Sequence, residues 1–466
     1  MRRAIAVNRF GLGSRPDDRI DDPRRWLLGQ FDAFEPRPAP IAALADATTN
    51  MARYFDFVAA RRQARAMQDA VTAPGVEPEV DAETVHDFVR DHARHIYADQ
   101  AVARITQSLT APAPFVERLV HFWANHFAVS IDRFSTLGIA GNLEFEAVRP
   151  HVLGRFSDML LAVERHAAML MYLDQFRSIG PESAAARRLA ELRPEARGRG
   201  LNENLAREVL ELHTLGVDGG YTQADVQELA RALTGWTIVG QRPVGDAPRG
   251  SVLFRPLLHE PGERLLLGRR YAATGEAQSR AMLADLALHP ATARHLATKL
   301  ARHFVADDPP KPLVDRLAAA YSGSGGDLPT LYRVLIEAPE AWATPLAKFK
   351  SPWDWSISAL RGVGLRSADR RAVRMVAEVG QPVWRPGSPA GWGDTAATWA
   401  GSDALMRRVE AAQQLAALIP VADARALAPL LFGGSVSPST AAAIAGAESP
   451  AQATALLLVA PEFQRR

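Results

Sequence analysis

The stretch NENLAREVLELHTLGVDGGYTQADVQELARALTGW, residues 202–236, decides the fold class because it reads as two amphipathic helices around a glycine turn. Apolar residues recur at every third or fourth position in both halves, which is the period of one helix face. The first helix is expected to end at Gly216, and the second to run from a Thr222 and Asp225 capping pair to Gly235. The same pattern extends over most of the chain, so we predict a mainly α protein.

The wider architecture predicted is an irregular multi-helix bundle, since loops rich in glycine and proline separate the helical patterns. Two short apolar runs in SVLFRPLLHEPGERLLLGRRYA flank Glu-Pro-Gly-Glu, which favours a small β-hairpin inserted near residues 252–271. Three further helices are expected within residues 289–340. A boundary near residue 240 divides the chain into an N-terminal helical half, 1–240, and a C-terminal half, 241–466, packed as one unit.

Composition narrows the function classes. The 466 residues are 47% hydrophobic with a formal charge of +2, and the arginines are scattered among acids, so no nucleic acid partner is expected. The absence of cysteine excludes disulfides, thiolate metal sites and cysteine nucleophiles. No apolar run is long enough for a membrane span. The N-terminus lacks a signal-peptide pattern, which predicts a cytoplasmic protein, with export alongside a signal-bearing partner left open.

Two acids on the first helix of the opening stretch need an explanation. Glu208 and Glu211 share one helix sector with Asn204 and Arg207. Like charges at that spacing repel, so the acids need solvent, an arginine or a cation. Three readings stay open: a solvated face, a structural network with arginine, or a catalytic or metal-binding carboxylate pair.

Other residues could complete such a site. His126 lies on an aromatic helix face in PFVERLVHFWANHFAVS, where a packed core histidine is the alternative to a ligand or base. Asp174 ends an apolar helix, a position unfavourable to the helix dipole, which favours a specific partner. Oxygen ligands alone suit magnesium, calcium or manganese, and an added imidazole suits zinc or iron. A divalent metal held by Glu208, Glu211, Asp174 and His126 is therefore the cofactor hypothesis.

A third feature is the concentration of tryptophan near the C-terminal end. Five of the nine tryptophans lie between Trp353 and Trp399, in a segment that also contains several prolines. Rigid aromatic loops of this kind can line a pocket for a sugar or a peptide, and packing onto helices is the alternative.

These stretches resemble a bacterial family, the domain of unknown function 1800. The resemblance rests on AVNRFGLG, HFWANHFAVS, AAMLMYLD, the opening stretch, HEPGERLLLG, ATKLARHFVADDPP, FKSPWDW and GQPVWRPGSPAGW, in this order along nearly the whole chain. It implies a mainly helical protein, often exported and often encoded beside a sulfatase-like protein. It marks these positions: Trp123, His126, Asp174, Asn202, Asn204, Arg207, Glu208, Glu211, Glu228, Arg231, Gly235, Trp236, His259, Gly268 and Gln381.

The leading hypothesis is a hydrolase acting by acid and base or through a divalent metal. Its catalytic residues would be Glu208, Glu211, His126 and Arg207. The substrate-binding residues would be Trp123, Asn204, Trp236, His259, Gln381 and Trp384. One alternative is a non-enzymatic binding or assembly partner of the sulfatase-like protein. Another is a carbohydrate or peptide binder that uses the tryptophan-rich segment.

Overall fold

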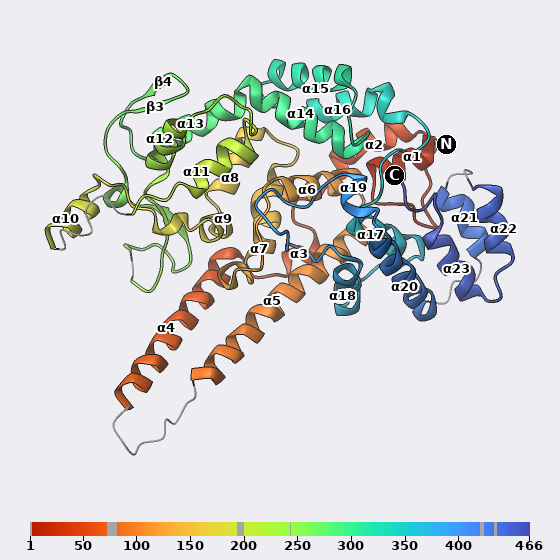
Figure 1. Cartoon of the computed structure of the whole chain (residues 1–466), viewed down its shortest axis with the longest axis horizontal. Helices are drawn as coiled ribbons and strands as arrows, with labels where there is room; N and C mark the ends of the chain where they lie inside the picture. Colours follow the sequence, from red (N-terminus) through yellow and green to blue (C-terminus); the bar gives the residue numbers. More distant parts are fainter. Residues whose placement is uncertain (1, 72–81, 193–199, 243, 420–423, 433–435) are drawn as a thin grey trace.

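The computed structural model describes residues 2–71, 82–192, 200–242, 244–419, 424–432 and 436–466, and it confirms the mainly α prediction (Figure 1). The N-terminal half contains α1 (Arg2–Ile5), η1 (Ala6–Phe10), α2 (Pro23–Ala33), α3 (Ala39–Ala42), α4 (Ala47–Val71), α5 (Ala82–Thr110), α6 (Pro114–His126), η2 (Phe134–Thr136), α7 (Ala140–Asn142), η3 (Leu143–Val148), η4 (Arg149–His151), α8 (Phe156–Glu164), α9 (Ala167–Tyr172), η5 (Gln175–Arg177), α10 (Ala184–Leu192), α11 (Asn204–Glu208), η7 (Val209–His213) and α12 (Gln223–Leu233).

The chain after α12 adds short strands and further helices. They are β1 (Trp236–Ile238), β2 (Val252–Phe254), η8 (Pro256–Leu258), β3 (Arg264–Leu266), β4 (Arg269–Tyr271), α13 (Glu276–Leu288), α14 (Pro290–Phe304), α15 (Lys311–Gly323), α16 (Leu328–Glu337), η9 (Pro339–Trp342), α17 (Pro352–Gly362), α18 (Arg370–Val379), α19 (Ala396–Trp399), α20 (Ser402–Leu418), α21 (Ala424–Phe432), α22 (Pro438–Ala445) and α23 (Pro450–Val459). The three helices expected within 289–340 are α14, α15 and α16, which pack in sequence, α14 on α15 and α15 on α16.

The opening stretch forms the predicted helical hairpin. Thr222 and Asp225 make a reciprocal capping box at the start of α12, and Gly216 takes a left-handed φ of 88° in the turn. The first helix differs from a regular α-helix, because α11 continues into η7, a π-helical turn. An apolar pattern read at 100° per residue does not register the extra residue of a π turn. The π turn ends at His213, whose side chain is buried.

The strands β2, β3 and β4 lie within the predicted segment 252–271, whereas β1 was not expected and the pairing differs. β2 pairs antiparallel with β1, not with β3, and β3 forms its own hairpin with β4. Gly235, with a φ of 98°, turns the chain after α12 into the extended strand β1. β2 then pairs with β1. Leu267 and Gly268 both have positive φ, 48° and 77°, as the two central positions of a tight hairpin turn of type I′ require.

Two regions extend from the centre of the molecule (Figure 1). The helices α4 and α5 pack side by side and project as a long helical arm, and α20 to α23 form a group at the opposite end. Between them, α6 lies near the middle of the molecule. Aromatic contacts join α6 to α14, and α17 and α19 lie on the side of α6 toward the C-terminal helices. This central position places α6 at the wall of the pocket described below.

Both halves of the chain contribute to one hydrophobic core cluster among the described residues. The Asn8 side chain donates to the carbonyl of Leu431 at 3.1 Å, and Arg118 of α6 forms a buried ion pair with Asp354 of α17 at 2.7 Å. Segments far apart in sequence are therefore in direct contact. The boundary near residue 240 stays a prediction.

Candidate functional site

A pocket of about 370 Å³ lies between α6, the C-terminal part of α14, the start of α17 and the segment 381–395. Its volume falls within the range of small-molecule sites in proteins, about 300–1,000 Å³. Three tryptophans of the C-terminal segment line it, together with cationic and imidazole side chains from the helices. The elements that form the pocket come from both halves of the sequence.

The floor of the pocket is a stack of aromatic and guanidinium groups. Arg104 of α5 lies over the ring of Trp353 at 4.1 Å and near that of Trp384 at 5.6 Å. Glu144 fixes this stack, because it accepts from Arg104 Nε at 2.8 Å and from Trp384 Nε1 at 2.8 Å. Trp384 has a φ of 49°, a left-handed conformation that costs a bulky residue about 1–3 kcal/mol. Backbone strain of this kind is concentrated at functional sites in proteins.

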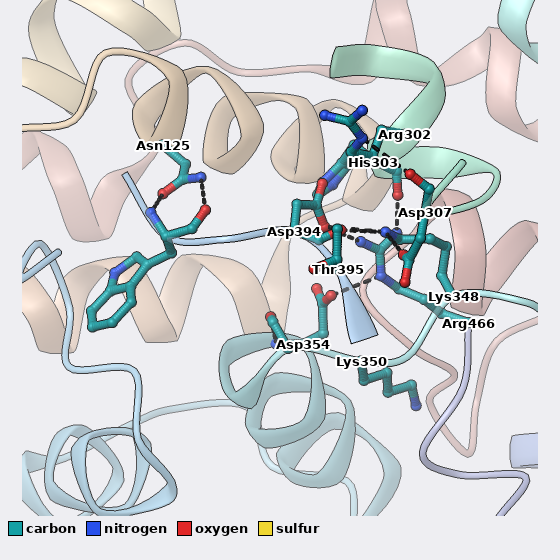
Figure 2. Close-up of polar contacts among 12 residues, drawn as sticks. Asn125, Arg302, His303, Asp307, Lys348, Lys350, Asp354, Asp394, Thr395 and Arg466 are labelled. Carbon is teal, nitrogen blue, oxygen red and sulfur yellow. Dashed lines mark hydrogen bonds and ion pairs between the residues drawn. The ribbon is translucent and has the colours of Figure 1, made fainter. Parts of the chain in front are cut away.

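The pocket lining also includes Trp392, whose backbone is held in place by Asn125. The side-chain amide of Asn125 donates to the Trp392 carbonyl at 2.9 Å and accepts from the Trp392 backbone N–H at 2.7 Å (Figure 2). Gly391 permits this approach, since a Cβ there would lie 2.3 Å from the Asn125 carbonyl oxygen. The indole itself is only partly buried. Trp392 therefore places a partly exposed aromatic side chain in the pocket lining from a fixed stretch of backbone.

Asp354, at the first turn of α17, is a buried carboxylate shared by two arginines. Arg118 Nη1 lies 2.7 Å from one oxygen of this carboxylate. Arg466 Nε lies 2.8 Å from the second oxygen (Figure 2). Ser351 caps the helix by accepting from the Asp354 backbone N–H. Burial alone would raise the pKa of Asp354, but the two guanidinium groups hold it well below the ordinary value. The carboxylate is therefore charged and fully compensated.

Asp394 lies beside this pair and orients a histidine. It accepts from His303 Nδ1 at 2.7 Å and lies 3.7 Å from Lys348 Nζ (Figure 2). Lys348 also bonds Asp307 at 2.5 Å. Burial would raise the pKa of Asp394, whereas His303, Arg466 and Lys348 lower it well below the ordinary value. Because Asp394 is ionised, it fixes the tautomer of His303 with the proton on Nδ1.

Two histidines of the lining present bare acceptors. Burial, only partly offset by Asp394, lowers the pKa of His303 to about 4, and its Nε2 has no partner among the described residues. His126 donates from Nε2 to the His213 carbonyl at 3.1 Å, which leaves Nδ1 as an acceptor without a partner in the same part of the chain. Burial and the nearby Lys299 lower the pKa of His126 well below 6.5. Both imidazoles are therefore neutral at pH 7.

Comparison with known families decides the relationship of the chain. The family model described as protein of unknown function (DUF1800) matches residues 5–465. The chain belongs to the DUF1800 family. No curated protein and no solved structure matches it.

The pocket of this DUF1800 chain includes three residues that the sequence singled out. His126, Gln381 and Trp384 line it, although they come from α6 and from a segment more than half the chain away. Gln381 accepts from the backbone N–H of Trp353 at 2.8 Å, so it also holds the start of α17 in place. The structure thus brings together one predicted catalytic residue and two predicted substrate-binding residues.

The acidic stripe of the DUF1800 chain lies outside this lining. Glu208 makes no hydrogen bond or ion pair within the described ranges. Burial raises the pKa of Glu208, and the negative charge of Glu211 raises it further. Glu211 accepts from the Tyr221 hydroxyl at 3.4 Å, and Arg207 bonds Glu203 at 3.2 Å. A structural arginine pair therefore exists on this helix, but with a different glutamate. A catalytic role for Glu208, Glu211 and Arg207 stays a prediction.

The four predicted metal ligands do not gather at one point. Asp174, with a φ of 58°, pairs with Arg133 at the surface at 2.6 Å, whereas His126 is buried. Among the described residues, which include all four ligands, no group of three or more histidine, aspartate or glutamate side chains is arranged to hold a metal ion. A metal site formed by Glu208, Glu211, Asp174 and His126 stays a prediction.

The other predicted substrate-binding residues have structural contacts elsewhere. Trp123 is buried and donates from Nε1 to the Tyr332 hydroxyl at 2.7 Å. Trp236 is buried at the start of β1, and His259 bonds the Thr234 carbonyl through Nδ1 at 2.9 Å. Asn204 is exposed at the start of α11. Substrate contacts by these four residues stay predictions.

Sequence reasoning missed the charged residues of the pocket, although a signal was present. The chain has only four lysines, and three of them, Lys299, Lys348 and Lys350, lie at or beside this site. Because lysine is rare in this chain, the three lysines near the pocket are a signal that the sequence offered for this site. Asp354, Asp394 and His303 carried no such signal.

Within the described ranges, no helix combines the length and the apolar run that crossing a bilayer requires. The compartment, the absence of a nucleic acid partner and the association with a sulfatase-like protein stay predictions.

Proposed function

We propose that the tryptophan-lined pocket binds carbohydrate. The observation that carries this proposal is Trp392, a partly exposed residue of the pocket lining whose backbone is held by both hydrogen bonds of the Asn125 amide and whose indole lies 5.8 Å from that of Trp399. An indole on a fixed stretch of backbone can stack on the apolar face of a sugar ring with a smaller loss of conformational entropy than an indole on a mobile loop. The bare acceptors His126 Nδ1 and His303 Nε2 match the hydroxyl donors that a sugar ring supplies.

The test is intrinsic tryptophan fluorescence titrated with a panel of neutral and acidic oligosaccharides. Binding is expected to shift the emission of the wild-type protein, and Trp392→Phe is expected to remove most of that shift. The matched control is Trp26→Phe, in α2, whose indole does not line the pocket. If no oligosaccharide changes the emission, or if a set of short peptides does so instead, carbohydrate binding is refuted.

Hydrolysis in the same pocket is the second candidate, supported by the Asp394 and His303 pair. A carboxylate that orients a neutral imidazole at 2.7 Å is the arrangement of a general base and its positioning group. A bound oligosaccharide that is cleaved by the wild type and not by His303→Gln would establish it. Intact oligosaccharide after prolonged incubation at saturating protein would leave binding alone.

A further inference from the structure

Two cations on α14 face the pocket without an acid partner. Lys299 lines the pocket and makes no hydrogen bond or ion pair with any residue that the structure describes. Arg302 also lines it, and its one contact within those residues is from Nε to the Asp307 carbonyl at 3.1 Å. The terminal nitrogens of Arg302 are therefore available to a ligand.

The remaining charges around the pocket already balance one another. Each carboxylate has its own cations: Glu144 with Arg104, Asp354 with Arg118 and Arg466, Asp394 with Lys348 and Arg466, and Asp307 with Lys348. These are four acids and four bases, and Lys350 beside them has a pKa that burial lowers to about 7. Lys299 and Arg302 are left as an uncompensated charge of two at one end of the pocket.

The protonation states reinforce this imbalance. Burial lowers the pKa of Lys299 to about 8, so the ammonium group is still mostly protonated at neutral pH. His126 and His303 are neutral at this pH, so they do not change the net charge of the pocket. A partly buried cation without a counterion costs free energy, which an anionic ligand would recover.

The same end of the pocket also presents acceptors. His126 is 1% exposed and its Nδ1 is unpartnered, next to the charge of Lys299. Sulfate offers no donor to this nitrogen, whereas a hydroxyl beside a carboxylate offers one. The site therefore fits a molecule with a carboxylate and a neighbouring hydroxyl on one ring.

We propose that the pocket is specific for sugar acids, with the carboxylate bound by Lys299 and Arg302 and ring hydroxyls donated to His126 and His303. This inference rests on the proposed carbohydrate binding and deepens it to a substrate class. Trp392 would stack on the sugar ring, while Lys299 and Arg302 of α14 would bind its carboxylate.

The experiment compares short oligomers of galacturonate, glucuronate and mannuronate with their methyl esters by calorimetry. Esterification removes the charge and keeps the ring and its hydroxyls. At least one acid is expected to bind about tenfold to a hundredfold more tightly than its ester, the range for charge-assisted hydrogen bonds. Lys299→Gln and Arg302→Gln are each expected to remove most of this preference while the ester still binds.

Arg294→Gln is the matched control, since Arg294 lies on the exposed face of the same helix and pairs with Asp315. It is expected to keep the preference. Equal binding of acid and ester overturns the sugar-acid proposal and leaves carbohydrate binding intact, whereas failure of both to bind or to change tryptophan emission refutes both. Equal binding of inorganic sulfate or phosphate overturns the proposal in favour of a free anion. Melting curves confirm that each variant is folded, and Lys299→Met replaces Lys299→Gln if that variant is not.

Discussion

At the scale of single residues, the pocket depends on carboxylates paired with cations, and two of them, Asp354 and Asp394, are each shared by two cations. Asp354 is 6% exposed and shared by Arg118 and Arg466, and so its removal would leave two buried guanidinium groups without their acid. This makes the side chain as important for stability as any apolar residue of the core.

Asp354→Asn is therefore expected to lower the free energy of unfolding by about 3–5 kcal/mol, as for other broken buried ion pairs. Asp403→Asn, which breaks the exposed pair with Arg407 on α20, is the control and should cost less than about 1 kcal/mol. Denaturant unfolding of the two variants measures the difference. Equal losses would show that the arginines are satisfied by solvent.

The buried histidines predict how stability depends on pH. Burial lowers the pKa of His303 to about 4, and those of His121 and His126 well below 6.5. In the unfolded chain these groups take up protons near pH 6.5, while the folded protein keeps them neutral. Their contribution is therefore fully present above about pH 6.5 and is lost as the pH falls toward 4.

Unfolding free energies measured between about pH 7 and pH 5 should decline by up to about 1.4 kcal/mol per pH unit for each such histidine. His303→Gln should show a shallower decline than the wild type, because it removes one of these protons. Aspartate protonation contributes only at lower pH, since Asp354 and Asp394 have lowered pKa values. Identical slopes in the two proteins would contradict a neutral buried His303.

Sequence alone could identify some of these residues and not others. His126 and Trp384 stand out by residue type in an aromatic or proline-rich context, and both line the pocket. Lys299 and Asp394 look like ordinary helix-surface and loop charges. Their place in the pocket depends on contacts between distant segments, such as the bond between His303 and Asp394, which no local pattern encodes.

At the scale of elements, local rules predicted the helices well because capping and periodicity are local. The Thr222 and Asp225 box and the Gly216 turn are present as expected. The π turn η7 was not predictable, because an inserted residue is stabilised by tertiary contacts such as the 2.8 Å bond from His213 to Glu164. The prediction of the strand pairing was wrong for the same reason. β2 pairs with β1, and no local pattern indicates which strand is its partner.

Substitution of two glycines can distinguish the effect of backbone conformation on stability from the effect of steric contact with an added Cβ. Gly29 in α2 and Gly268 in the β3–β4 turn both have nothing within 4 Å of an added Cβ, but Gly268 has a φ of 77°. Gly29→Ala is expected to stabilise the protein by about 0.5–1 kcal/mol, because alanine restricts the unfolded chain and suits a helix.

Gly268→Ala is expected to destabilise by about 1–2 kcal/mol, because its left-handed conformation disfavours a Cβ. Thermal unfolding of both variants provides the comparison. A gain in stability for Gly268→Ala would mean that the β3–β4 turn is not of type I′.

At the scale of the whole molecule, the pocket is assembled from segments that span most of the sequence. α6 lies at the centre, α14 covers one side, and residues 381–395 cross the opening (Figures 1 and 2). The acidic stripe on α11 and η7 lies outside this lining. The choice between these two surfaces is a choice between carbohydrate binding and the carboxylate chemistry that the sequence first suggested.

Amide hydrogen exchange with and without the tightest-binding uronate oligomer tests the central claim most directly. Binding at the pocket predicts slower exchange in residues 381–395 and in the adjoining ends of α6 and α14, with residues 204–213 unchanged. Slower exchange confined to residues 204–213, with 381–395 unaffected, would contradict the assignment of the pocket as the functional site.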